Sequence, residues 1–245
     1  MAPPQTACQI AGILFDKDGT LFDFDATWRA VCERALGVLA PDPATHAAMA
    51  RAGGYDPDSR SFVPDSILVA GATAEVAALW VPFRPDLGAV VIERLLDDTG
   101  IAVLSDPPAL SPAAADLPGL LAGLRADGYA LVVATNDSER SALLQLDIAG
   151  AAGAFDFVAG YDSGHGMKPE PGVLLAFAAA TGLAPGEVVM VGDSRHDLEL
   201  ALNAGAAMAV AELTGPAKRD DLAPHAGHVL PSIEHLPALL ADRCG

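Results

Sequence analysis

Short apolar runs alternate with amphipathic stretches in the second half of the chain. Four runs are predominantly apolar and too short for helices, which is typical of strands buried in a parallel sheet. They cover residues 129–135, 155–160, 187–193 and 206–213. The stretches between them begin with Ser or Pro, repeat apolar residues at helical spacing and end in Gly, as helices do. They cover residues 138–150, 171–182 and 194–205.

This alternation predicts an α/β fold, because parallel strands are joined by right-handed helical crossovers that cover both faces of the sheet. A first apolar run at residues 10–15 and a helical pattern at 114–128 complete a Rossmann-like parallel sheet core. We expect residues 1–22 and 113–245 to form this core.

The segment between these two parts has a different pattern. Helical spacing recurs at residues 26–40, 73–83 and 87–101, whereas residues 53–65 form a polar, turn-rich loop. No part of the segment has a clear strand pattern. We therefore predict an all-helical domain at residues 23–112, inserted directly after the first strand of the core.

Composition argues against several classes of function. The 245 residues are 51% hydrophobic, which indicates a globular protein, and they carry a formal charge of −18. Nucleic acids and anionic membranes are both bound by basic surfaces, so neither is an expected partner. The sequence has no recognisable secretory signal and no apolar run long enough to span a bilayer.

The cysteines suggest a reducing environment. Cys8, Cys32 and Cys244 are odd in number and have no CxxC spacing, so we expect neither a disulfide framework nor a thiolate zinc site. These features predict a cytoplasmic protein, either a monomer or a homodimer.

Unusual polar residues follow the predicted strands, at the edge of a parallel sheet where ligands collect. They are Asp16 and Asp18 after the first strand, Thr135 and Asn136 after the second, Lys168 after the third, and Asp193 with Asp197 after the fourth. Four clustered carboxylates repel one another unless a cation neutralises them. Carboxylate oxygens suit Mg²⁺, so the pattern predicts a magnesium-dependent acidic site.

Four motifs in this order resemble those of the haloacid dehalogenase superfamily of phosphotransferases. The motifs are DKDGT at residues 16–20, TN at 135–136, KPEP at 168–171 and GDSRHD at 192–197. The resemblance extends over nearly the whole chain and implies that the helical insertion is a cap domain over the active site. Within the superfamily, the cap is similar to that of phosphoglycolate phosphatases.

The resemblance implies a role for each acidic residue of the motifs. Asp16 would be the nucleophile that forms an aspartyl-phosphate, and Asp18 would protonate the leaving alcohol and later deprotonate the attacking water. Mg²⁺ would be held by Asp16, the backbone carbonyl of Asp18 and Asp193. Asp197 would bind it either directly or through water.

The same resemblance places Thr135 and Asn136 on the transferring phosphoryl oxygens and Lys168 beside the nucleophile. Taken singly, the residues of the four motifs also fit ordinary structural roles. Asp-Gly-Thr is common in turns, TN and GDS are common helix N-caps, and a lysine is usually solvated. Lys168 is a stronger candidate for the site than a typical lysine, because the chain has only three lysines, the others being Lys17 and Lys218. Alternation along an extended strand predicts that Lys17 points away from the site.

Structural roles are expected for several residues outside the motifs. We expect Asp23 and Asp25 at the hinge into the cap, and Trp28 and Trp80 in the cap core rather than in a substrate platform. The loop at residues 53–60 is the candidate for reaching the substrate, with Tyr55 and Arg60 as contacts; an ordinary surface loop is the alternative.

Details of the motifs separate activities within the superfamily. Dehalogenases lack an acid at the position of Asp18, and phosphonatases use a cap lysine that the segment 24–112 does not contain. Thr20 favours hydrolysis over the phosphomutases, which commonly have Val there. We expect a phosphatase of a small phosphorylated metabolite, with phosphoglycolate the leading candidate. A β-phosphoglucomutase-type enzyme and a catalytically silent binding protein remain as alternatives.

Overall fold

The computed structural model describes residues 10–106 and 110–244. The predictions that concern Cys8 and the amino-terminal segment fall outside these residues. Among the described residues, no helix combines the length and the apolar composition that crossing a membrane requires.

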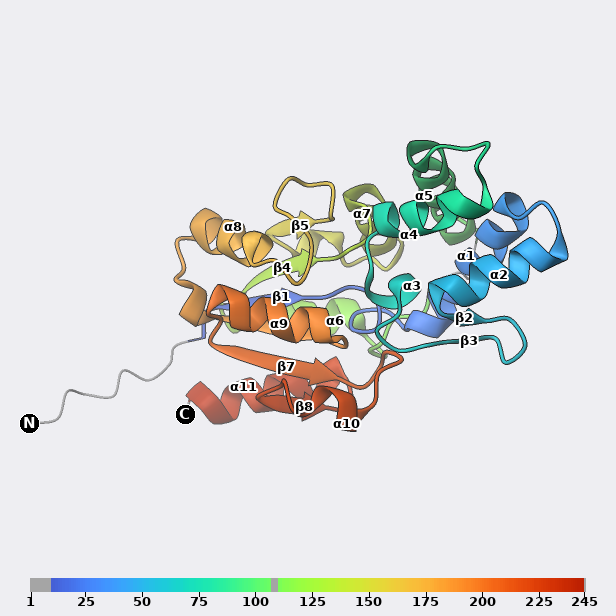
Figure 1. Ribbon diagram of the computed structural model, residues 1–245. Coiled ribbons are helices and arrows are strands. Elements are labelled where there is room, and N and C mark those ends of the chain that lie inside the picture. Colours follow the sequence, from blue (N-terminus) through green and yellow to red (C-terminus); the bar gives the residue numbers. More distant parts are fainter. Residues whose placement is uncertain (1–9, 107–109, 245) are drawn as a thin grey trace, which may run out of the picture.

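The core is a parallel sheet with the strand order β5-β4-β1-β6-β7-β8 (Figure 1). Its strands are β1 (Gly12–Phe15), β4 (Ala130–Ala134), β5 (Phe157–Ala159), β6 (Val188–Gly192), β7 (Met208–Glu212) and β8 (His228–Leu230). All five predicted strands are present, which confirms the α/β fold class. Strand β8 was not predicted, because its three residues are too few to form an apolar run.

Helices cover both faces of the sheet, as predicted. They are α6 (Leu117–Ala126), α7 (Glu139–Ile148), α8 (Gly172–Thr181), α9 (Arg195–Ala204), α10 (Arg219–Leu222) and α11 (Leu236–Cys244). Side chains of β1 alternate between the two faces: Ile13 and Phe15 pack with α6, α7 and α11, whereas Leu14 packs with α8 and α9. Because all the strands of this sheet pair in parallel, their carboxyl ends lie along one edge.

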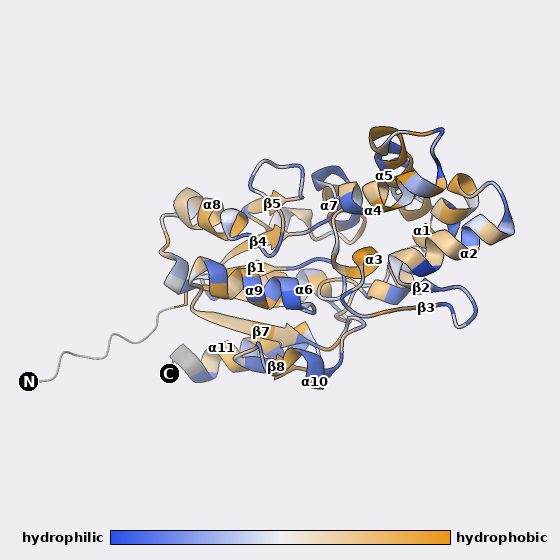
Figure 2. Cartoon of the chain, in the orientation of Figure 1, coloured by the Kyte–Doolittle hydropathy of each residue, from blue (hydrophilic) through white to orange (hydrophobic). Residues whose placement is uncertain are grey.

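The inserted segment forms its own hydrophobic cluster beside that edge (Figure 1). Its helices are α1 (Phe24–Leu39), α2 (Pro43–Gly53), α3 (Ile67–Ala70), α4 (Thr73–Trp80) and α5 (Ala89–Leu104). Figure 2 shows that apolar residues are abundant in α3 and α4.

The prediction of an all-helical insertion needs one correction. Strands β2 (Tyr55–Asp56) and β3 (Ser61–Phe62) form a short antiparallel hairpin where the sequence indicated a loop. The hairpin is stabilised by a cross-strand aromatic pair, because the ring centroids of Tyr55 and Phe62 lie 4.9 Å apart and Phe62 also packs against Phe24. Two residues per strand are too few to produce a detectable alternation.

Candidate active site

The loop after β1 is a tight turn that presents its carboxylates beyond the sheet. The amides of Leu21 and Phe22 both donate to the carbonyl of Lys17, at 2.9 and 3.1 Å. Gly19 has a φ of 90°, and a Cβ at this position would collide with the Asp193 carboxylate. Glycine is therefore required here by conformation and by space. The turn brings the first motif against the fourth.

Asp16, Lys168, Asp193 and Asp197 form a buried cluster, with each residue at most 6% exposed. The Lys168 Nζ donates to Asp16 and, at 2.7 Å, to Asp197 Oδ1. The other Asp197 oxygen accepts from the Ser194 amide at 3.0 Å and its hydroxyl at 2.6 Å, which caps α9. Lys168 and Ser194 thus engage both oxygens of Asp197.

The cluster holds more negative charge than its lysine balances. Burial raises the pKa of Asp16 to about 7, although Lys168 opposes the shift. Burial and the neighbouring carboxylates Asp16 and Asp197 raise the pKa of Asp193 well above its usual range. Carboxylate oxygens of Asp16, Asp193 and Asp197 all lie within 4.8 Å of one another. Hard oxygen donors with an uncompensated charge at this spacing fit a divalent cation.

Asp18 stands apart from this cluster, beside Lys17. The Lys17 Nζ lies 2.6 Å from Asp18 Oδ2 and 3.2 Å from Asp137 Oδ2. Burial lowers the pKa of Lys17, but the Asp18 and Asp137 carboxylates outweigh burial and raise it overall. Asp18 Oδ1 is buried and has no hydrogen-bond partner among the described residues. This oxygen is therefore available to a ligand.

The prediction that Lys17 points away from the site was wrong. Its ammonium pairs with Asp18 and lies 5.3 Å from the centroid of the Trp28 ring. Strand alternation gave the wrong direction because β1 ends at Phe15 and the turn begins at Lys17. Asp137, which the sequence analysis missed, is the second partner; only its position directly after the TN motif could have indicated it.

Replacing Lys17 by Met is expected to destabilise the fold by about 3 kcal/mol, because it leaves two largely buried carboxylates without their cation. Asp137→Asn should recover part of this loss in the double variant, since one of the two carboxylates is then neutral. Urea unfolding of the single and double variants measures both effects. Lys218→Met, on an exposed lysine, is the matched control and should change stability little. Equal stability of the Lys17 and Lys218 variants would contradict the prediction.

The second motif lies at the carboxyl end of β4, where Thr135 and Asn136 are both buried. Thr135 Oγ1 accepts from the Asp137 amide at 3.1 Å, which leaves its hydroxyl hydrogen for another acceptor. The Asn136 Nδ2 donates to the carbonyls of Ala70, at 2.9 Å, and Lys168, at 3.1 Å, and its Oδ1 accepts from the Lys168 amide at 2.9 Å. These bonds engage the side chain of Asn136 and join the site to α3. That Asn136 also holds a phosphoryl oxygen stays a prediction.

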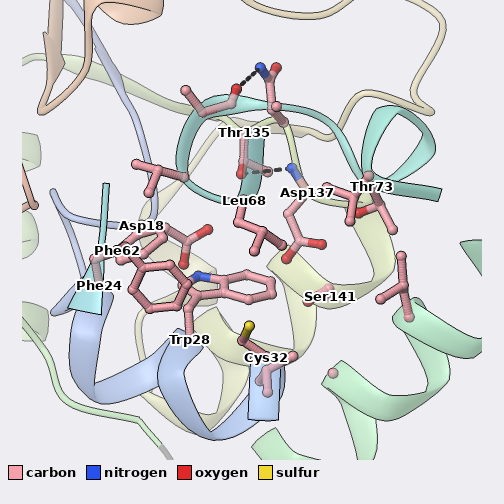
Figure 3. Close-up of a pocket in the computed structure, with 18 of the residues that line it drawn as sticks. Asp18, Phe24, Trp28, Cys32, Phe62, Leu68, Thr73, Thr135, Asp137 and Ser141 are labelled. Atoms are coloured by element: carbon pink, nitrogen blue, oxygen red, sulfur yellow. Dashed lines mark hydrogen bonds between the residues drawn. The ribbon is translucent and has the colours of Figure 1, made fainter. Parts of the chain in front are cut away.

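A cavity extends from these groups into the insertion (Figure 3). Asp16, Asp18, Thr135, Lys168 and Asp193 line its floor. Side chains of the insertion form the opposite wall, including Phe24, Trp28, Phe62, Leu68, Val76 and Trp80. The cavity therefore joins the predicted site residues to a large apolar surface.

Four predictions about the insertion have different outcomes. Trp80 is fully buried and donates to the Met49 carbonyl at 3.1 Å, as expected of a core residue. Trp28 and Trp80 both line the cavity, so neither is only a core residue. Tyr55 and Arg60 are both bonded to Glu33, at 2.6 and 2.8 Å, and neither lines the cavity. These pairings could not be predicted from the sequence, because Glu33 lies on α1 whereas Tyr55 and Arg60 belong to the β2–β3 hairpin.

Comparison with known proteins agrees with this geometry. A model of the haloacid dehalogenase-like hydrolases matches residues 10–205, which are most of the chain. The chain belongs to this family. The order of the four motifs in the sequence indicates the same family.

Individual members of the haloacid dehalogenase-like hydrolases resemble the chain over most of its length. A phosphoglycolate phosphatase of Shigella boydii is 31% identical over 205 residues, which are 80% of this chain and 79% of the relative. The structure of a predicted phosphoglycolate phosphatase from Haemophilus somnus has a TM-score of 0.70 at 19% identity, covering 96% and 99% of the two chains. A provisionally assigned beta-phosphoglucomutase from Thermotoga maritima has a TM-score of 0.66 at 18% identity, covering 95% and 99%. At these identities the two structures show a shared fold.

Proposed function

We propose that this hydrolase is a Mg²⁺-dependent phosphatase that cleaves a small phosphomonoester through an aspartyl-phosphate. The observation that carries the proposal is the pairing of Asp16 with Lys168 in a buried acidic cluster that opens onto the cavity. Asp18 lines the same cavity, and one of its carboxylate oxygens has no hydrogen-bond partner among the described residues. A nucleophile and a separate acid–base group are what hydrolysis in two steps requires.

In the first step, Asp16 attacks phosphorus and the bond from phosphorus to the alcohol oxygen breaks. Asp18 Oδ1 gives its proton to that oxygen. In the second step, water attacks the aspartyl-phosphate, Asp18 takes a proton from the water, and Asp16 leaves as a carboxylate. Lys168 supplies positive charge beside Asp16, and Asp197 positions Lys168 through their hydrogen bond of 2.7 Å.

The remaining polar groups position these reactants. Thr135 is proposed to donate its free hydroxyl hydrogen to a phosphoryl oxygen. Mg²⁺, when bound by Asp16, Asp193 and the backbone carbonyl of Asp18, would screen the repulsion between the nucleophile and the phosphate. Asp197 completes the acidic set around that position.

We further propose that residues 23–112 act as a cap on a core formed by residues 1–22 and 113–245. The two connections run side by side: Phe22 pairs with Pro112, and the Asp23 amide donates to the Ser111 carbonyl at 2.8 Å. Such paired linkers suit a hinge. Asn136 would couple the position of the cap to the site, because its side-chain amide donates a hydrogen bond to the Ala70 carbonyl in α3.

A phosphate-release screen over phosphomonoesters, with Mg²⁺ and with EDTA, tests the proposal. Phosphoglycolate belongs in the screen because the relatives carry that name. We expect release that stops in EDTA and needs no sugar bisphosphate. A requirement for such an activator would favour a phosphomutase, and no release from any ester would favour a binding protein.

Metal binding should also be visible as a change in stability. The pKa values of Asp16 and Asp193 are raised in the folded state. At a pH above the ordinary carboxyl pKa, the folded protein without a cation therefore binds more protons than the unfolded chain. Stability is therefore expected to fall as pH rises from about 4 to about 7, and bound Mg²⁺ should oppose this fall. Thermal unfolding measures the effect: Mg²⁺ should raise the melting temperature more at about pH 8 than at about pH 5.

Asp193→Asn provides the control for this measurement. It removes a proposed ligand and should largely abolish the gain from Mg²⁺ at the higher pH. An equal gain in the wild-type and variant proteins would contradict the ligand assignment.

A further inference from the structure

We propose that the alcohol group of the substrate is uncharged and predominantly apolar, with an aromatic ring preferred. This inference rests on the proposed phosphatase function, because it describes the part of the ester that remains after phosphate is removed. It is drawn from the chemistry of the cavity wall that faces the reacting groups.

The wall contributed by the insertion is built mainly from apolar side chains, with Thr73 and Asp97 as its polar members. It includes Phe24, Trp28, Val31, Phe62, Leu68, Val76, Trp80 and Leu96. The aromatic members lie together: the ring centroids of Phe24 and Phe62 are 5.1 Å apart in an edge-on arrangement, and Figure 3 shows Trp28 beside them. Rings arranged in this way favour another ring through both buried area and edge-to-face geometry.

Positive charge is confined to the phosphate end of the cavity. Among the described lining residues, Lys168 is the only Lys or Arg, and it is already paired with Asp16 and Asp197. The acidic side chains of the lining are the carboxylates of Asp16, Asp18, Asp97, Asp137 and Asp193. A carboxylate or a second phosphate on the alcohol would therefore enter an acidic, apolar space without a counterion.

Two nearby cations, Lys17 and Arg140, do not line the cavity themselves, and both are already paired with carboxylates that do. Lys17 lies between Asp18 and Asp137. Arg140 is 63% exposed and is shared between Asp97 and Asp98, at 3.5 and 3.4 Å.

One polar group of the wall has no partner in the described part of the chain. The Trp28 Nε1 is buried and donates no hydrogen bond there. A buried indole N–H usually has an acceptor. An acceptor on an otherwise apolar alcohol, such as an ether or phenol oxygen, would satisfy it without bringing a charge.

Phosphoglycolate does not match this wall. Its alcohol carries a carboxylate, and the lining offers no free cation to bind that group. The chain is therefore expected to differ in substrate preference from the relatives that carry the name phosphoglycolate phosphatase.

Matched esters test the inference in the full-length protein with Mg²⁺. The first pair is 4-methylbenzyl phosphate and 4-carboxybenzyl phosphate, and the second is isobutyl phosphate and 2-phosphoglycolate. The members of each pair have similar shapes and differ in the charge of the alcohol. We expect kcat/KM to be at least about tenfold higher for the uncharged member of each pair, and higher for 4-methylbenzyl than for isobutyl phosphate.

A positive charge introduced into the cavity wall provides a second test of the inference. Leu68 lines the cavity from α3, and Leu68→Lys should shift the 4-carboxybenzyl to 4-methylbenzyl ratio of kcat/KM toward the carboxylate by about tenfold. Leu68→Met is the matched control, because it keeps the wall apolar and should preserve the ratio. Circular dichroism verifies that both variants fold.

The outcomes separate the inference from the function on which it rests. Hydrolysis with an equal or higher kcat/KM for the carboxylated esters overturns the inference but leaves the phosphatase proposal intact. An unchanged ratio in Leu68→Lys also counts against it. No phosphate release from any of the four esters overturns the phosphatase proposal, and the inference with it.

Discussion

Replacing Asp16 by Asn is expected to lower phosphate release by at least about four orders of magnitude, because an amide cannot attack phosphorus in place of a carboxylate. The substitution keeps the size of the side chain and removes one negative charge from the buried cluster. The variant should therefore fold and be at least as stable as the wild type. Steady-state phosphate release gives the rate, and acid-quenched reactions with a radiolabelled ester show whether a phosphoenzyme forms.

The expected result is a wild-type protein that becomes labelled and a variant that does not. Asp127→Asn is the matched control, because Asp127 is exposed at the end of α6 and its amide should leave activity unchanged. Activity in Asp16→Asn within tenfold of the wild type would exclude Asp16 as the nucleophile.

Replacing Asp18 by Asn is expected to have the second-largest effect, and one that depends on the leaving group. The amide has no acidic proton for the departing alcohol, so kcat/KM for benzyl phosphate should fall by about 10²–10⁴. The loss should be much smaller for 4-nitrophenyl phosphate, because nitrophenolate leaves readily without a proton. Comparing kcat/KM for the two esters isolates the first step, since both form the same phosphoenzyme.

The second step should also slow in this variant, because no carboxylate accepts the proton of the attacking water. With 4-nitrophenyl phosphate this predicts a burst of about one nitrophenolate per enzyme, followed by slow turnover. Stopped-flow absorbance measures the burst. Equal losses for the two esters, without a burst, would show that Asp18 is not the acid–base group.

The core could be predicted from the sequence because its signals are local. Continuous apolar runs such as residues 187–193 are typical of strands covered on both faces, and they alternate with helical patterns that end in Gly. Since the carboxyl ends of parallel strands share one edge, Asp16, Lys168 and Asp193 could be expected to meet although they are far apart in sequence. The structure brings these three together in one buried cluster.

Side-chain direction outside regular elements could not be predicted in this way. Lys17 lies in a turn, where the alternation of a strand no longer applies, and its ammonium is positioned by Asp137. The Asn136 amide is engaged by the carbonyls of Ala70 and Lys168. These partners come from distant segments, so their positions depend on tertiary packing.

By itself, the sequence determined the fold class, the family and most of the polar groups that line the buried end of the cavity, because regular periodicity and short motifs are local properties of the chain. Only the tertiary structure decided what faces those groups. Trp28, Phe62, Leu68, Val76 and Leu96 come from separate elements of the insertion and meet in the cavity wall. Their spacing in the sequence does not predict that they share a surface. We expect substrate preference to depend on that surface, which forms only when the insertion folds beside the core.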